Sequence, residues 1–206
     1  DIRDLAANHP AVGRAVLKLF DHVRHLRRPG ARAGDEPPGT GYNVVTEAVS
    51  DFLQENANHF PALEAAASRV RHDIDNASDS FEQGLKTYLF NVFGIETRLA
   101  SLPNGVVRRL EDGGRVLSVA DTLEPESAQF VLAQHLALLA ADTEIRALIE
   151  ESTLPQPDSL GLARNVLASY VAAALIMPYE AFYAACRNTR YDIERIGRRF
   201  RASFEQ

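Results

Sequence analysis

The sequence predicts a predominantly helical α+β domain, in which a three-stranded antiparallel meander packs on a central helix and on the helices that follow it. Three observations predict this class. Apolar residues recur at helical spacing over most of the chain, the period shortens to two between Ile95 and Ala120, and the helix that Pro125 begins is apolar nearly all round. With 206 residues, 46% hydrophobic and 24% charged, the chain has the composition of a globular protein with one main core.

The first 41 residues predict a helix followed by a linker. Pro10 stands where a proline begins a helix, and apolar residues at helical spacing continue to Leu26. Residues 27–41 hold three prolines and four glycines without apolar periodicity, which is typical of a flexible connection. We therefore expect a helical arm over 1–26, a linker over 27–41 and the main domain over 42–206.

Three helices are predicted before the sheet. Apolar spacing predicts the first around residues 45–53, a break follows at 58–61, and the second covers 63–74. Ser80 and Gln83 have the spacing of a capping box, which predicts that a third helix begins there and ends at the following glycine, Gly94.

The strands are predicted by alternation and by turn residues. Residues 95–99 alternate apolar with polar, and Pro-Asn-Gly at 103–105 is a strong turn signal. Two further apolar runs, 106–110 and 116–120, flank a Gly-Gly turn. Because tight turns join consecutive antiparallel strands, these three runs predict the meander.

Helices fill the rest of the chain. After the central helix, apolar spacing and prolines predict a short helix near 145–149, a long one over 159–177, a shorter one over 180–187 and a last one from Tyr191. The longest uncharged stretch, within the long helix, is 15 residues. A spanning helix needs about 20 apolar residues, so we predict a buried core helix and no membrane partner.

Composition excludes several function classes. A net charge of −6 argues against this segment being the reader of nucleic acid, which needs a basic surface. A single cysteine, Cys186, cannot form an internal disulfide, which favours a cytoplasmic location. The chain begins at Asp1 without methionine and ends in a Ser203–Gln206 capping box, so we expect it to be a piece of a longer protein.

The central helix resembles the active-site helix of the ImmA/IrrE-like metallopeptidase domain over residues 130–139. Such zinc peptidases carry H-E-x-x-H on this helix. The resemblance puts Gln134 and Leu138 where the two histidines belong, and His135 where the glutamate belongs. Other catalytic motifs are also missing from the sequence. We therefore predict a degenerate zincin-like helix with no catalytic residues and no metal ligands; His135 is either a hydrogen-bonded core histidine or a ligand contact.

Residues 162–182 and 190–194, with 58–64 and His9-Pro10, resemble the family of short-chain fatty-acyl transcriptional regulators, whose members include regulators of propionate catabolism in mycobacteria. The resemblance implies a sensor domain for a short-chain acyl-coenzyme A such as propionyl-CoA, acting as an effector rather than a cofactor. It also implies a helix-turn-helix DNA-binding domain before this segment and a cysteine-bearing domain after it, which in some members holds an iron–sulfur cluster.

A coenzyme A site needs cations for the phosphates, an aromatic face for the adenine and an apolar channel for the acyl chain. The candidates for the apolar and aromatic part are Phe52, Phe60, Tyr88, Tyr170 and Met177. The candidates for the polar part are Lys86, His135, Arg187, Arg190 and Tyr191. Core packing is the competing interpretation for each aromatic residue. Arg190 and Tyr191 precede the last predicted helix, whose free N–H groups favour an anion.

We therefore expect a sensor that makes and breaks no bond and that controls DNA binding by a domain outside this segment. We also expect a homodimer, because prokaryotic helix-turn-helix regulators usually read two-fold sites. Two alternatives remain at this point. One is a vestigial or altered metallohydrolase that uses His135 with Asp or Glu ligands, and the other is a dimerisation domain that binds nothing.

Overall fold

The computed structural model describes residues 40–154 and 157–202. The elements in this part of the chain are α3 (Thr40–Glu55), α4 (Pro61–Ala77), α5 (Phe81–Phe93), β1 (Glu96–Ala100), β2 (Arg108–Glu111), the 3-10 turn η1 (Asp112–Gly114), β3 (Val116–Ala120), α6 (Pro125–Ala140), α7 (Asp142–Glu150), α8 (Pro157–Ile176), α9 (Tyr179–Thr189) and α10 (Ile193–Phe200). The predicted arm, most of the linker and the last capping box lie outside the described residues. Because α3 begins at Thr40, the last two residues of the predicted linker are helical.

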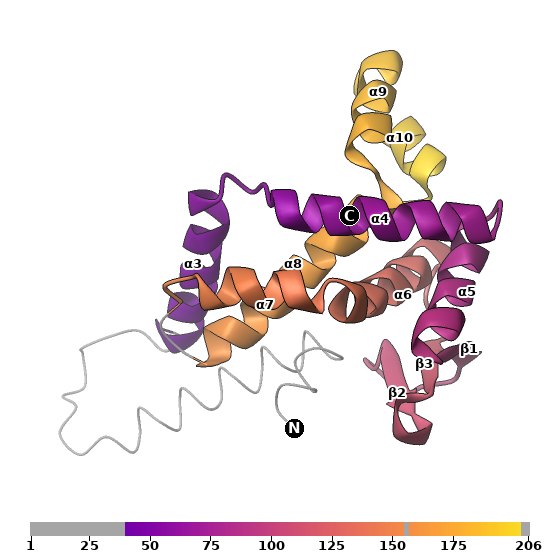
Figure 1. Cartoon of the computed structure of the whole chain (residues 1–206), viewed down its shortest axis with the longest axis horizontal. Helices are drawn as coiled ribbons and strands as arrows, with labels where there is room; N and C mark the ends of the chain where they lie inside the picture. Colours follow the sequence, from indigo (N-terminus) through magenta and orange to yellow (C-terminus); the bar gives the residue numbers. More distant parts are fainter. Residues whose placement is uncertain (1–39, 155–156, 203–206) are drawn as a thin grey trace.

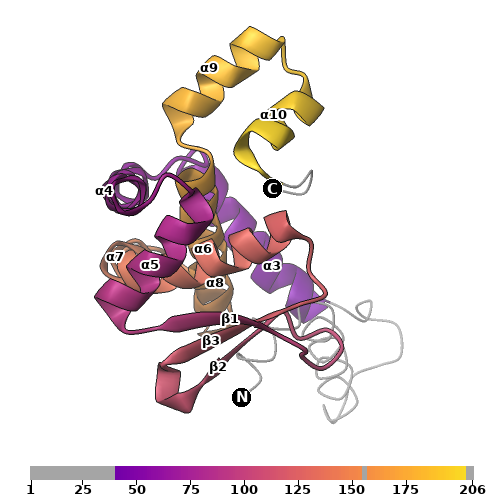
Figure 2. The ribbon, with the colours of Figure 1, turned by 90° about the vertical axis from the view of Figure 1, so that its right-hand side faces the viewer.

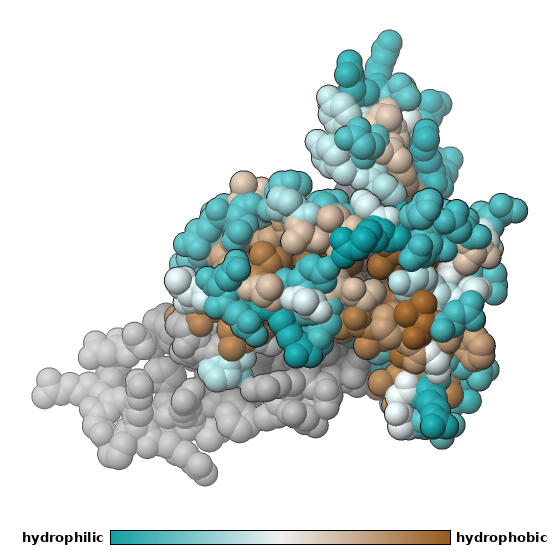
Figure 3. All heavy atoms as spheres, in the orientation of Figure 1, coloured by the Kyte–Doolittle hydropathy of each residue, from teal (hydrophilic) through white to brown (hydrophobic). Residues whose placement is uncertain are grey.

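The predicted class, mostly helical with a small sheet, is confirmed. Helices α5 and α6 cover one face of the sheet, and the remaining helices pack beyond them (Figures 1 and 2). Helices α9 and α10 form a hairpin that projects from the body (Figure 2). Figure 3 shows a mostly hydrophilic surface on this hairpin, whereas apolar side chains gather over α6 and towards the sheet.

The sheet is mixed, and the prediction of a purely antiparallel meander is wrong. The strand order is β1-β3-β2, with β1 parallel to β3 and β2 antiparallel to β3. Strand β3 is nearly all buried, whereas β1 carries the charged Glu96 and Arg98. The most apolar strand therefore takes the central position, and the charged strand forms an edge. Alternation within a strand does not reveal which neighbour it pairs with, and this is why the sequence pattern did not predict the order.

Helix α8 is a buried core helix, as predicted. It packs against α3, α4, α6 and α7, and its buried residues include Leu167, Val171 and Leu175. By length and composition alone, α8 is the one helix in the described residues that is long and apolar enough to cross a membrane. Its contacts with four other helices identify the same apolar surface as part of the core.

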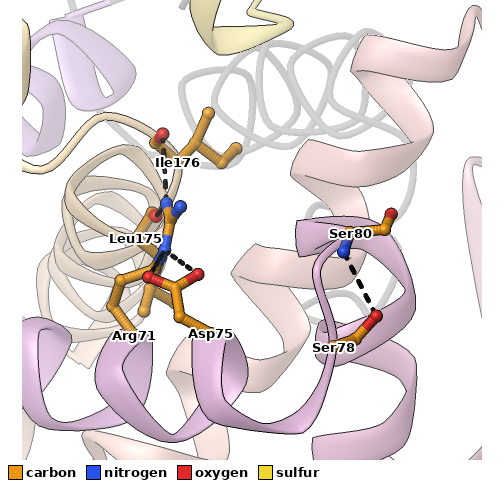
Figure 4. Close-up of polar contacts among 6 residues, drawn as sticks. All are labelled: Arg71, Asp75, Ser78, Ser80, Leu175 and Ile176. Atoms are coloured by element: carbon orange, nitrogen blue, oxygen red, sulfur yellow. Dashed lines mark hydrogen bonds and ion pairs between the residues drawn. The ribbon is translucent and has the colours of Figure 1, made fainter.

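The predicted helix ends agree with the structure at two positions that can be examined closely. Gly94 caps α5 in the left-handed region, at φ 67°, where glycine is favoured. Ser80 is the N-cap residue of α5, but its side chain makes no capping hydrogen bond. Its backbone N–H instead donates to Ser78 Oγ at 3.2 Å (Figure 4).

Candidate functional site

Gln134 of α6, which the sequence resemblance places at the first histidine of the zinc-peptidase motif, is hydrogen-bonded through both of its amide atoms. Gln134 Oε1 accepts from Arg108 Nη1 at 3.1 Å, and Gln134 Nε2 donates to Ser169 Oγ at 2.7 Å. The Ser169 hydroxyl donates in turn to the backbone carbonyl of Asn165 at 3.0 Å. These bonds join β2, α6 and α8 into one polar chain at the centre of the domain.

Arg108 is the functional candidate that sequence reasoning missed. Its residue is only 6% exposed, and burial lowers the pKa of its guanidinium. An arginine retains its charge even so, because its guanidinium is not deprotonated in proteins. In the observed register Arg108 lies opposite the buried Val119, on the inward face of the sheet. That register could not be read from the sequence because it depends on the pairing of β2 with β3.

His135 lies beside this polar chain on α6. Its Nε2 atom is buried and has no hydrogen-bond partner among the described residues. Burial, together with the smaller effect of the positive charge of Arg108, lowers the pKa of His135 to about 4. The imidazole is therefore neutral at pH 7. The interpretation of His135 as a hydrogen-bonded core histidine therefore does not hold for its Nε2 atom, which has no partner among the described residues.

The residues at the motif positions do not fit a zinc ion. Leu138 has no donor atom, and Gln134 is engaged by Arg108 and Ser169. In the part of the chain that the structure describes, no group of three or more His, Cys, Asp or Glu side chains is placed to hold a metal. A buried guanidinium 3.1 Å from Gln134 also opposes a second cation at this place.

Three of the predicted aromatic candidates lie together where α3, α4 and α8 meet. The ring centroids of Phe52 and Phe60 are 5.8 Å apart, and Tyr170 contacts Phe60 edge to face at 5.4 Å. The Tyr170 hydroxyl donates to Glu64 Oε1 at 2.6 Å and accepts from the Phe60 backbone N–H at 3.5 Å. Burial, together with the hydrogen bond to Glu64, raises the pKa of Tyr170 to about 12. The cluster therefore combines core packing with a polar tip.

Helix α5 and the end of α8 hold three other candidates. Tyr88 lies next to Phe93, with ring centroids 6.3 Å apart, and burial raises the pKa of its phenol. Lys86 forms an ion pair with Glu82 at 2.7 Å, one turn earlier on the same helix. Met177 packs against the main core. Each of these side chains has a structural partner, and a role in ligand binding stays a prediction.

The remaining candidates lie on the α9–α10 hairpin. Tyr179 and Tyr183 are exposed and stacked, with centroids 6.1 Å apart, and the Arg187 guanidinium lies 5.9 Å from the Tyr183 centroid. Arg190 and Tyr191 are both exposed. These two residues have φ values of 55° and 63°, so the turn between the helices has a left-handed backbone.

The N-terminus of α10 already holds an anionic side chain. Asp192 is the N-cap residue, and its carboxylate accepts from the Arg195 backbone N–H at 3.1 Å. A ligand phosphate near Arg190 would therefore share this helix end with the Asp192 carboxylate. The exposed Arg190 side chain remains the stronger reason to expect an anion here.

Comparison with known proteins finds a matching family and several relatives that agree with one another. Residues 90–206 match the family described as the IrrE N-terminal-like domain. The chain is 28% identical over 211 residues to the HTH-type transcriptional regulator RamB of Mycobacterium tuberculosis, covering 100% of this chain and 44% of that protein. It is 30% identical over 212 residues to the HTH-type transcriptional regulator PrpR of the same species, covering 99% and 43%.

A third relative and a solved structure agree with these two. The propionyl-CoA carboxylase regulator of Cereibacter sphaeroides is 28% identical over 210 residues, covering 100% of this chain and 44% of that protein. A solved structure of a Mycobacterium tuberculosis transcriptional regulator is 32% identical with a TM-score of 0.72, covering 77% of this chain and 49% of that one. The chain thus spans less than half the length of these relatives.

Proposed function

This chain belongs to the family of IrrE N-terminal-like domains, and on that premise we propose that it is the effector-sensing part of a helix-turn-helix transcriptional regulator. The resemblance predicted from the sequence is confirmed at the level of the family, and the three named relatives are regulators, two of them HTH-type transcriptional regulators. The effector in this proposal is a short-chain acyl-CoA such as propionyl-CoA. Its binding alters DNA binding by a domain outside this segment and so controls genes of fatty-acid and propionate metabolism.

The observation that carries the proposal is the polar chain at the former metal position. Arg108, Gln134 and Ser169 are joined by hydrogen bonds where a peptidase of this fold would hold zinc. Residues that do not fit a zinc ion give no way to activate water as a zinc peptidase does. What it retains is a buried charge with directional donors, which is suited to binding a ligand without cleaving it. We infer that the domain is not an enzyme and that it acts in the cytoplasm.

The other candidate residues supply what the rest of the ligand requires. The aromatic cluster of Phe52, Phe60 and Tyr170 offers apolar contacts for pantetheine. The hairpin offers exposed arginines, Arg187 and Arg190, for phosphates. One relative is named as a regulator of a propionyl-CoA carboxylase, which favours propionyl-CoA among short-chain effectors.

Helix α8 gives a physical route from the ligand to the rest of the regulator. It carries Ser169, which ends the polar chain, and Tyr170, which belongs to the aromatic cluster. The same helix ends at Ile176, and Pro178 connects it to the projecting hairpin. In this proposal, a ligand that displaces Ser169 or Tyr170 moves the end of α8 and therefore the hairpin.

Native mass spectrometry of the purified protein tests this function. We expect a retained adduct with the mass of an acyl-CoA, or its appearance after addition of propionyl-CoA. Calorimetry should show saturable binding of propionyl-CoA at one site per chain. If no acyl-CoA binds at millimolar concentration, the sensor function is wrong, and a dimerisation domain becomes the better description.

The zinc content of the purified protein distinguishes an altered metallohydrolase from a sensor. Elemental analysis after dialysis should find no stoichiometric zinc, because Gln134 and Leu138 replace the two histidines. One zinc per chain, together with hydrolysis of a peptide library that a chelator abolishes, would favour the hydrolase.

A further inference from the structure

The α9–α10 hairpin is the positively charged part of an acidic chain. Residues 179–202 hold six arginines, no lysine and three acidic residues, whereas the whole chain has a net charge of −6. The hairpin projects from the body of the domain (Figure 2), and its surface is mostly hydrophilic (Figure 3). Exposed charges more than about 10 Å apart are largely screened at ordinary salt concentrations. A polyanion that approaches the hairpin therefore meets mainly its local positive charge.

Three of these arginines form one side of α10. Arg195, Arg198 and Arg199 are all exposed, and their spacing of three and four residues makes them neighbours on the helix surface. Arg198 and Arg199 lie in the last turn, where cations offset the negative end of the helix dipole. Arg195 lies in the first turn, where the dipole disfavours a cation. The helix dipole therefore does not explain the whole arginine side of α10.

The positive charge of this side is only partly offset by carboxylates. Arg195 Nε lies 3.5 Å from Asp192 Oδ2, and Arg198 Nη2 lies 3.0 Å from Glu194 Oε2. Both salt bridges are exposed, so each contributes little to stability and a phosphate oxygen can replace the carboxylate. Arg199 has no salt bridge among residues 40–154 and 157–202. The arginine side of α10 can therefore pair with an external anion at low cost.

The apolar side of α10 is turned inward. Ile196 is buried, and Phe200 lies against Phe182 of α9, with ring centroids 6.0 Å apart. A helix that binds a membrane surface needs its apolar face free to enter the lipid, so this arrangement does not suit a membrane. What α10 presents to solvent is its arginine side, and guanidinium groups bind phosphate oxygens through paired hydrogen bonds.

We propose that the arginine side of α10 contacts the phosphate backbone of double-stranded DNA, next to the site that a helix-turn-helix domain outside this segment reads. A helix of eight residues is about 12 Å long, and one DNA strand carries a phosphate about every 3.4 Å of its axis. The length of α10 therefore matches about three phosphates. Two relatives are HTH-type transcriptional regulators, which makes DNA the polyanion expected beside this hairpin.

This contact holds the regulator on DNA without reading the sequence, because phosphates are the same at every base pair. The inference rests on the proposed function, in which the hairpin moves with the end of α8, and it adds what the hairpin contacts. An effector that moves α8 would then change the distance between the arginine side of α10 and the DNA backbone.

Fluorescence anisotropy of the unmodified chain with a labelled DNA duplex of about 20 base pairs tests the contact. We expect a dissociation constant of roughly 10⁻⁴ M or tighter at low salt. The logarithm of the affinity should fall against the logarithm of the salt concentration with a slope of about −2.7, because each of about three phosphate contacts contributes about −0.9. A second duplex of unrelated sequence should give the same affinity and slope.

Variants then assign the contact to α10. The combined variant Arg195→Gln, Arg198→Gln and Arg199→Gln should bind the duplex at least about tenfold more weakly, with a salt slope near zero. The matched control makes the same change of net charge in the body of the domain, by replacing with glutamine three exposed arginines of α4, β2 and α7, namely Arg69, Arg109 and Arg146. It should keep the parent affinity within about twofold, because screening separates the body from the hairpin. Circular dichroism checks that both variants are folded.

The outcomes separate this inference from the sensor function. If the parent chain binds neither duplex at low salt, or if the hairpin and control variants lose affinity equally, the DNA contact of α10 is wrong. Sedimentation with phosphatidylglycerol vesicles in the absence of duplex binding would replace DNA by an anionic membrane as the partner. The hairpin variant should bind propionyl-CoA with the parent affinity in calorimetry. Failure of the parent to bind any acyl-CoA would overturn the sensor function and leave the DNA contact standing.

Discussion

Arg71 of α4 donates through Nη1 to the backbone carbonyl of Leu175 at 2.6 Å, across 104 positions of the chain (Figure 4). The same nitrogen reaches the carbonyl of Ile176 at 3.5 Å, and Nε bonds both carboxylate oxygens of Asp75. The last carbonyls of a helix lack intrahelical partners, and the helix dipole is negative there. Arg71 therefore satisfies the end of α8 directly before Pro178 turns the chain into the hairpin.

Arg71→Met should lower the free energy of unfolding by about 1.5–3 kcal/mol, the range for hydrogen bonds that involve a charged group. Arg69→Met is the matched control on the same helix, because Arg69 pairs with Glu144 in an exposed salt bridge, and it should cost less than about 1 kcal/mol. Urea unfolding measures both. Equal losses in the two variants would show that the α8 carbonyls do not depend on Arg71.

Gly84→Ala should destabilise the packing of α4 on α5 by about 1–3 kcal/mol, as overpacking does. A Cβ at Gly84 would lie 2.5 Å from the backbone oxygen of Ile74 and 2.9 Å from its Cγ2, so the helices would have to separate. Gly161→Ala provides the control, since a Cβ there meets nothing within 4 Å. That helix position should gain about 0.4–1 kcal/mol. Thermal unfolding temperatures that fall for Gly161→Ala and hold for Gly84→Ala would contradict this packing.

The stability of the fold should fall between pH 6.5 and pH 4 because of His135. The pKa of His135 is about 4 in the folded protein against the ordinary value of 6.5 for a histidine, so the unfolded chain binds the extra proton first. Stability from this group is therefore complete above pH 6.5 and is lost as the pH falls towards 4. At about 1.4 kcal/mol per pH unit the loss reaches about 3 kcal/mol. Denaturant unfolding at several pH values should show a shallower slope for His135→Leu than for the parent, and parallel slopes would contradict the buried neutral state.

Arg190→Ala should weaken acyl-CoA binding about ten- to hundredfold, if Arg190 contacts a phosphate through a charged hydrogen bond. Stability should change little because the side chain is exposed. Arg199→Ala is the control, an exposed arginine 5.9 Å from the Phe200 ring on the same hairpin. Calorimetry that finds one affinity for the parent and both variants would place the phosphates elsewhere.

The protein should be a homodimer in solution, because two-fold symmetric operator sites are read by dimeric helix-turn-helix regulators. Light scattering at micromolar concentration should give twice the mass of one chain. A mass equal to one chain at this concentration would count against self-association through this segment.

Periodicity in the sequence predicted the helices well because each helix buries its own apolar face. The long run from Ser159 became the core helix α8, with Leu167 and Leu175 fully buried. Periodicity did not predict the order of the strands, because pairing depends on the burial of the whole strand. Val116–Ala120 is central and Glu96–Ala100 forms an edge, although the turn between residues 103 and 105 predicted that β1 pairs with the strand that follows it.

The site was predicted only in part, for a related reason. Phe52, Phe60 and Tyr170 were chosen as separate aromatic candidates, and the structure brings them into contact. Arg108 was missed because its inward position follows from the register opposite Val119. The two hydrogen bonds of Gln134, to Arg108 of β2 and to Ser169 of α8, could not be predicted either, because they join residues far apart in the chain.

The parallel pairing of β1 with β3 also sets an order of events during folding. Strands β2 and β3 are joined by the three residues of η1 and by Arg115, so they can close as a local hairpin on the microsecond timescale. Strand β1 must wait until β3 has been synthesised, and it then closes a loop that contains β2. A nascent chain that stops before β3 therefore presents β1 as an unpaired edge, open to other chains. We expect the charges of Glu96 and Arg98 to keep that edge from aggregating while it waits.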